Sequence, residues 1–139
     1  SVTAYIPDEY VPDTDLKMEF YQRLAEARRI VDLLSIVEEM QDRFGRMPYQ
    51  AQSLLSIMEI KIMASQLGLE GVQLEKSRLR LIFPEQKGIS PTDIQQLVHK
   101  SSVELEFDVG ERLTVETFIR ATDEQERLAK AKEIIQEML

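Results

Sequence analysis

Apolar residues recur with a helical period over much of the first half of the chain. The clearest stripe consists of Leu33, Ile36, Val37, Met40 and Phe44. These residues fall at i, i+3, i+4, i+7 and i+11, which predicts the apolar face of a helix over about 32–44. Gly45 is suited to end this helix in a left-handed conformation, and Pro48 is suited to begin the next one.

Two further helices are predicted on either side of this one. A first helix is expected over about 14–28, capped by Asp13 or Thr14. A third is expected over 48–67, with Gly68 as its stop. Apolar residues of the third helix spread too widely for one surface-facing stripe, so we expect it to be covered on more than one side.

After Gly68 the apolar period changes from 3.6 to 2. A β-hairpin around a turn at 75–78 is predicted by Val72, Leu74, Leu79, Leu81 and Phe83. Two later strands are predicted by Val103, Leu105 and Phe107, and then by Leu113 and Val115.

Two helices are predicted in the C-terminal half. Ser90, Pro91 and Asp93 form a helix opening, and the buried side of that short helix should be Ile94, Leu97 and Val98. Residues 122–125 (TDEQ) predict a capping box for a last helix. Its expected buried stripe is Leu128, Ala131, Ile135 and Met138.

This order of elements predicts an α+β fold. We expect an N-terminal helical half of three helices, packed with a small and mostly antiparallel sheet, and a closing C-terminal helix. Residues 1–14 should form an extended arm that lies on the domain, and the alternation of Val2, Ala4 and Ile6 with polar residues allows a short edge strand there. The length of 139 residues fits a single domain spanning 1–139.

The composition narrows the functional classes. Seventeen basic and 25 acidic residues give a net charge of −8, which argues against phosphate-backbone binding as the main role. The absence of Cys excludes disulfides and thiolate sites and suits a reducing, cytoplasmic location. No apolar run is long enough for a membrane span. The chain begins with Ser and not Met, which suggests a piece of a longer protein.

Catalytic and cofactor motifs are missing from the sequence. The five Gly residues are scattered and make no phosphate loop, and His99 is the only imidazole. Paired catalytic carboxylates would have to face each other across a cleft, which spacing alone does not show. We therefore predict no enzyme, no cofactor, no metal site and no catalytic residue.

A charged arc on the predicted helix at 32–44 is the remaining candidate site. Glu39, Asp42 and Arg43 lie within about 100° of one another, away from the apolar stripe. One interpretation is local, since Glu39 and Arg43 have the spacing of a helical ion pair and Asp42 could pair with Arg46. The other is a docking surface, in which charges determine register and specificity.

Three blocks give the chain a family resemblance: residues 5–13 (YIPDEYVPD), 20–24 (FYQRL) and 39–48 (EMQDRFGRMP). In this order and spacing they resemble the C-terminal domain of bacterial transcription-repair coupling factor. The resemblance extends through the third helix and is looser in the β region.

The resemblance implies a function. The full-length family protein is an ATP-driven DNA translocase that displaces stalled RNA polymerase and recruits UvrA, and its motor motifs are absent here. Its C-terminal domain masks the UvrA-binding module until polymerase is engaged. Carried over to this chain, the partner-docking residues are Glu39, Asp42 and Arg43, facing charged residues of that module.

Two other interpretations stay open. The first is a nucleic-acid-contacting accessory domain of the same translocase, which would need a basic stripe such as Lys76, Arg78 and Arg80. The second is an enzyme with a carboxylate cleft, which would need a deep pocket with perturbed acids.

Overall fold

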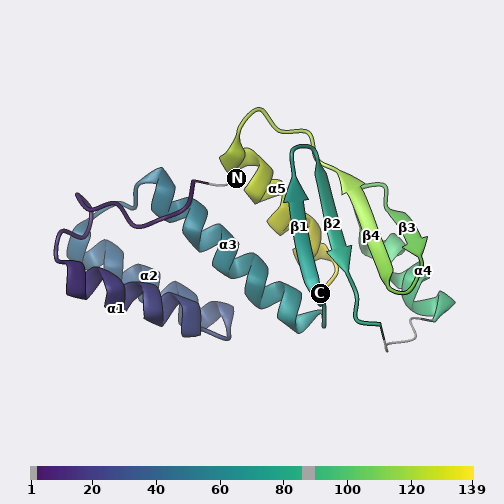
Figure 1. The fold of residues 1–139 in the computed structure, drawn as a ribbon, viewed down its shortest axis with the longest axis horizontal. Coiled ribbons are helices and arrows are strands. Elements are labelled where there is room, and N and C mark those ends of the chain that lie inside the picture. Colours follow the sequence, from purple (N-terminus) through teal and green to yellow (C-terminus); the bar gives the residue numbers. More distant parts are fainter. Residues whose placement is uncertain (1–2, 86–89) are drawn as a thin grey trace. The chain divides into compact units, whose positions relative to one another are not determined.

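The computed structural model describes residues 3–85 and 90–139 and confirms the α+β class. The described residues contain five helices and one four-stranded antiparallel sheet (Figure 1). The chain divides into two compact units, Ser1–Ile62 and Met63–Leu139, called the N-terminal and C-terminal units below. We describe each by itself.

The N-terminal unit contains α1 (Thr14–Glu26), α2 (Ile30–Phe44) and most of α3 (Tyr49–Gln66). Of the two predicted cap residues, Asp13 and not Thr14 caps α1, because the Asp13 carboxylate accepts the backbone N–H of Leu16 at 3.0 Å. The predicted boundaries of α1 and α2 were off by two residues each, which is the usual uncertainty at frayed helix ends.

The predicted stripe of α2 is confirmed. Leu33, Val37 and Met40 are buried, while Ile36 and Phe44 are partly buried against the same core. That core also takes residues from all three helices and from the preceding arm. Its other buried members are Ile6, Val11, Phe20, Leu24, Met47, Ala51, Leu54 and Ile62.

The arm lies on the helices of its own unit. Ile6 and Val11 are almost fully buried, and the N–H of Ile6 donates to the Tyr21 hydroxyl at 2.7 Å. The predicted edge strand was wrong for the described part of the arm, which forms a turn at residues 8–10 instead; Val2 lies outside the described residues. The difference follows from where the donors of this segment go: the Tyr5 N–H bonds to the Gln50 carbonyl of α3 and the Ile6 N–H to the Tyr21 hydroxyl of α1, so neither bonds to a strand.

The sheet of the C-terminal unit has the order β1-β2-β4-β3. Its strands are β1 (Gly71–Glu75), β2 (Arg78–Ile82), β3 (Glu106–Val109) and β4 (Leu113–Phe118), all antiparallel to their neighbours. The predicted hairpin is confirmed as β1–β2, with a two-residue turn in which Lys76 has a φ of 48°.

One face of the sheet is apolar. In the view of Figure 1, α5 (Glu124–Glu137) crosses behind β1. Leu79, Leu81 and Val115 on this face are at most 1% exposed. The predicted stripe of the last helix is confirmed, since Leu128, Ala131, Ile135 and Met138 are all buried.

Two predictions in this unit were wrong in extent. α4 (Pro91–Lys100) has the predicted Ser90 cap, but its expected buried side is not buried: Ile94 and Leu97 are half-buried and Val98 is 51% exposed. β3 begins only at Glu106, so Val103 and Leu105 lie outside it. A local turn holds this segment, because the N–H of Val103 donates to the Ser101 hydroxyl at 3.2 Å.

The cap of α5 is displaced by one residue from the predicted capping box. Asp123 and not Thr122 is the N-cap, since its carboxylate accepts the N–H of Glu126 at 2.9 Å. The Glu126 carboxylate in turn accepts the Thr122 hydroxyl at 2.6 Å and the Thr122 N–H at 2.9 Å. These bonds hold the pKa of Glu126 at about 2, below its ordinary value of 4.5.

This cap makes stability depend on acid pH in a specific window. Because the pKa of Glu126 is lower in the folded chain, its ionised carboxylate stabilises the fold above about pH 4.5, and this stabilisation is lost as the pH falls toward 2. We expect NMR titration of the side-chain carboxyl to give an inflection near pH 2, and Thr122→Val to raise it. An inflection near 4.5 in the unmodified chain would contradict this assignment.

Candidate functional site

The candidate docking arc, Glu39, Asp42 and Arg43, lies on the C-terminal half of α2. Its first member is held by a residue of α1. Arg23 donates two hydrogen bonds to the Glu39 carboxylate, Nη1 to Oε2 at 2.8 Å and Nη2 to Oε1 at 2.9 Å. This bidentate geometry is stronger and more directional than a single contact. The pair therefore links α1 to α2 and determines the orientation of Glu39.

Arg43 is held against two aromatic rings. Its guanidinium carbon lies 5.3 Å from the centre of the Phe44 ring and 5.7 Å from that of Phe20. Its Nη1 lies 3.5 Å from Glu39 Oε2, so the predicted helical ion pair is confirmed. The side chain is still 48% exposed, which leaves its outer edge accessible to a partner.

Asp42 is exposed, and its side-chain carboxylate has no hydrogen bond or ion pair within residues 3–85 and 90–139. The expected alternative pairing with Arg46 does not form. Gly45 has a φ of 87° and takes the chain out of the helix before Arg46, so the i, i+4 geometry is lost. Since the C-terminal end of a helix disfavours an anion, Asp42 is the charge of the arc that an external cation would stabilise most.

Electrostatics keep the inner part of the arc ionised. The hydrogen bonds from Arg23 lower the pKa of Glu39, and the same bonds raise the pKa of Arg23. Glu39 is thus an anion whose oxygens are already engaged. The outward-facing charges of the arc are Asp42 and Arg43, one of each sign.

The sequence did not reveal two residues on which this arrangement depends. Arg23 is 16 residues from Glu39, so no helical spacing connects them. Phe20 is fully buried and supports both Arg23, at 5.1 Å, and Arg43. Both residues lie in the block 20–24, and the family resemblance of that block was the only available signal.

The basic stripe required for nucleic-acid contact is largely neutralised. Arg78 lies 2.8 Å from Glu116 and 3.1 Å from Glu106, and Arg80 lies 3.3 Å from Glu116. Lys76 is exposed at the hairpin turn. Arginines that already pair with carboxylates neutralise few phosphates, so their binding would release few counterions from a nucleic acid. This surface therefore does not favour the nucleic-acid interpretation.

Other kinds of site receive little support from the described residues. They contain no group of three or more His, Asp or Glu side chains that could hold a metal ion. His99 is exposed on α4. None of the helices in the described part of the chain is both long and apolar enough to cross a membrane.

Comparison with known proteins gives consistent matches. Residues 1–94 match the TRCF domain family. The chain is 29% identical over 110 residues to a protein named transcription-repair-coupling factor from Escherichia coli, covering 79% of this chain and 10% of that protein. A protein of the same name from Bacillus subtilis is 32% identical over 83 residues, covering 60% of this chain and 7% of that protein.

The fold has a solved counterpart. A crystal structure of the C-terminal domain of transcription-repair coupling factor matches with a TM-score of 0.79 and 21% sequence identity. The match covers 99% of this chain and 89% of that one. The chain spans a tenth or less of the length of these two curated relatives. The family match covers residues 1–94, more than half of the chain, and the chain therefore belongs to the TRCF domain family.

Proposed function

We propose that residues 1–139 act as a regulatory, non-catalytic domain of a transcription-repair coupling factor. The domain docks on the UvrA-binding module of the same protein and masks it. The parent protein, a DNA translocase acting with RNA polymerase and UvrA, stays autoinhibited until polymerase is engaged. The docking residues are Glu39, Asp42 and Arg43.

The observation that carries this proposal is the organisation of the arc. Bidentate pairing with Arg23 and stacking on Phe20 and Phe44 hold Glu39 and Arg43 in place before any partner arrives. Asp42 is left exposed at the end of a helix, and no cation among the described residues pairs with it. Charges that are already positioned lose little entropy on binding, so they suit a specific docking contact.

The mechanism is a shift of populations. Docking stabilises a closed state in which the UvrA-binding surface is covered, and engagement of RNA polymerase and DNA stabilises an open state. A coupling free energy of about 1–3 kcal/mol changes exposure of that surface by roughly 5- to 150-fold. A weak contact is sufficient, because tethering within one chain gives an effective concentration of around millimolar.

The test is binding of this domain, in trans, to the isolated UvrA-binding module by calorimetry at two salt concentrations. We expect weak, salt-sensitive binding that Asp42→Asn reduces about 5- to 10-fold. Asp108→Asn is the matched control, because Asp108 is an exposed acid of β3 and its change alters the net charge equally. Asp42→Asn is more informative than removing Glu39, whose loss would also leave Arg23 without its carboxylate.

Two results would overturn the proposal. One is no binding of the module at millimolar domain concentration. The other is binding that Asp42→Asn and the triple variant Glu39→Ala/Asp42→Ala/Arg43→Ala both leave unchanged. In either case the arc would be interpreted as an ordinary solvated helix surface with local ion pairs.

A further inference from the structure

The edge of β4 that faces β3 is left open at its C-terminal end. The N–H of Ile119 donates to the Ser77 carbonyl at 2.7 Å, and the N–H of Phe83 donates to the Leu113 carbonyl at 3.0 Å. Odd-numbered residues of β4 therefore bond toward β2, and the even-numbered ones bond toward β3. The ladder with β3 ends at the pair Glu106–Glu116, so the backbone of Phe118 extends beyond it.

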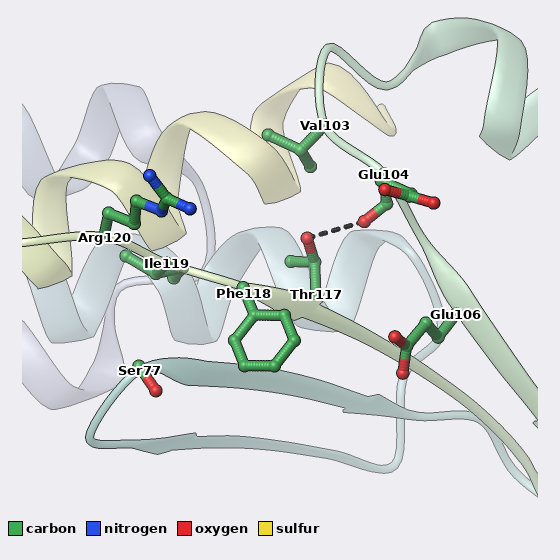
Figure 2. A pocket seen from close by; sticks show the side chains of 8 residues that line it. All are labelled: Ser77, Val103, Glu104, Glu106, Thr117, Phe118, Ile119 and Arg120. Carbon is green, nitrogen blue, oxygen red and sulfur yellow. Dashed lines mark hydrogen bonds between the residues drawn. The ribbon is translucent and has the colours of Figure 1, made fainter.

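A hollow lies where the chain leaves this edge. Residues 103–105 diverge from β4 and are held by the Thr117 hydroxyl, which donates to the Glu104 carbonyl at 2.7 Å. Figure 2 shows this bond between the two segments that enclose the hollow. Its volume is roughly 590 Å³. Its lining residues include Val103, Phe118, Ile119 and Arg120.

A second hollow adjoins the first. Its volume is roughly 350 Å³, and it shares Val103, Phe118, Ile119 and Arg120 with the first. Ile134 and Lys130 of α5 complete it on the other side. Both volumes fall in the range of about 300–1,000 Å³ that is common for binding pockets. The two hollows together form one groove, called the β4 groove below, which runs from the open strand edge to α5.

Charges in the β4 groove indicate what it would accept. Arg120 is exposed, lines both hollows, and forms no ion pair within the described residues. The other charged groups there are partly engaged: Glu106 with Arg78, and Lys130 with Glu126. Glu104 lines only the first hollow and Glu133 only the second, and both are exposed. Among the described residues, Arg120 is thus a cation outside any ion pair that lines both hollows, and each hollow has one acid outside any ion pair, Glu104 in the first and Glu133 in the second.

We infer that the β4 groove binds an extended peptide segment of a protein partner. The segment pairs with the Phe118 backbone as an added strand, since an exposed strand edge offers main-chain hydrogen bonds to a peptide. An apolar side chain contacts Val103 and Ile119, and an acidic side chain two residues away pairs with Arg120. Basic residues at the ends of the segment complement Glu104 and Glu133.

The open edge argues for a peptide over a small molecule. A ligand without a backbone would use the apolar walls and Arg120 but leave the Phe118 N–H and carbonyl unused. The exposed Phe118 ring, which stacks with Arg78 at 4.4 Å, flanks the edge on the opposite face. It offers a cross-strand aromatic contact to the incoming strand.

The test uses the ¹⁵N-labelled 139-residue chain and a capped peptide, Lys-Val-Thr-Asp-Thr-Lys, followed by NMR. We expect the peptide to shift the Phe118 and Arg120 amides at millimolar concentration and to slow hydrogen exchange at Phe118. Arg120→Ala in the chain, or Asn for Asp in the peptide, should weaken binding about 5- to 10-fold. Arg46→Ala is the matched control, an exposed arginine of the N-terminal unit that forms no ion pair among the described residues.

Each contrary result is distinct. A short peptide that adds one strand is expected to bind with millimolar affinity, so 2 mM peptide should give detectable amide shifts. The absence of any amide shift at this concentration would overturn the inference. Amide shifts that spread over acidic surface residues, and that Arg46→Ala reduces as much as Arg120→Ala does, would indicate non-specific electrostatic attraction. That result would also contradict the inference. Neither outcome bears on docking through α2, because that test uses another surface and another partner.

Discussion

Phe20→Ala is expected to lower the free energy of unfolding of the N-terminal unit by about 3–5 kcal/mol, as large-to-small changes in aromatic cores do. Phe20 is fully buried, and its ring meets the Phe44 ring edge-on at 5.7 Å between centroids. It also supports the guanidinium groups of Arg23 and Arg43. The change therefore removes core volume, an aromatic pair and the seat of two charged side chains together.

The chain offers a selective probe for this experiment. It has no Trp, and all four Tyr residues (Tyr5, Tyr10, Tyr21 and Tyr49) lie in the N-terminal unit. Urea unfolding followed by tyrosine fluorescence therefore reports that unit alone. Met18→Ala is the control on the same helix, since Met18 is 58% exposed and should change stability by less than about 0.5 kcal/mol.

A loss larger than the stability of the unit would leave Phe20→Ala unfolded without urea. Phe20→Leu keeps the experiment quantitative, with an expected loss of about 1–2 kcal/mol. A Phe20→Ala midpoint equal to that of Met18→Ala would contradict the role assigned to this ring. The same variant should also weaken docking, because Arg23 and Arg43 lose their common support.

Gly45→Ala is expected to destabilise the N-terminal unit by about 1–3 kcal/mol although the added methyl group meets nothing. No heavy atom lies within 4 Å of a Cβ built at Gly45, so there is no steric clash with the surroundings. The cost comes from the backbone, whose φ of 87° and ψ of −165° lie in a region that only Gly adopts readily. This conformation is fixed on both sides: the Gly45 N–H donates to Gln41 at 2.9 Å, and its carbonyl accepts the Tyr10 hydroxyl at 2.7 Å.

Two comparisons separate backbone strain from other causes. Gly45→Asn should be as harmful as Gly45→Ala, because Asn tolerates a left-handed helical conformation but not this ψ. Gly110→Ala, measured by far-UV circular dichroism, should be nearly neutral, since its site is equally open and its φ is ordinary. Full stability of Gly45→Ala, or rescue by Asn, would show that the strain is absent.

These predictions explain why the block 39–48 has both polar and conformational requirements. Met40 and Phe44 pack into the core, Glu39 and Arg43 belong to the proposed docking arc, and Gly45 turns the chain toward Pro48. A change at Gly45 would therefore act on the proposed docking arc through the end of α2, without changing Glu39, Asp42 or Arg43.

The sequence by itself determined the elements that depend on local chemistry. The α2 stripe, the Asp13 and Ser90 caps, the Gly45 stop and the β1–β2 hairpin were all predicted and are all observed. Each depends on residues within a few positions of one another, where periodicity and backbone preference are decisive. The charged arc of Glu39, Asp42 and Arg43 was predicted for the same reason, because the three residues share one helix, and its docking role stays a proposal.

Only the tertiary structure decided which long-range partners each side chain has. Arg23 engages Glu39 from another helix, and Arg78 and Arg80 pair with Glu106 and Glu116. In the part of the chain that the structure describes, Asp42 pairs with no cation. The early departure of residues 103–105 from β4, which opens the groove, depends on Ser101 and Thr117 and on no alternation of apolar residues. Such pairings depend on distances between segments far apart in the chain, and a period of 2 or 3.6 residues carries no information about them.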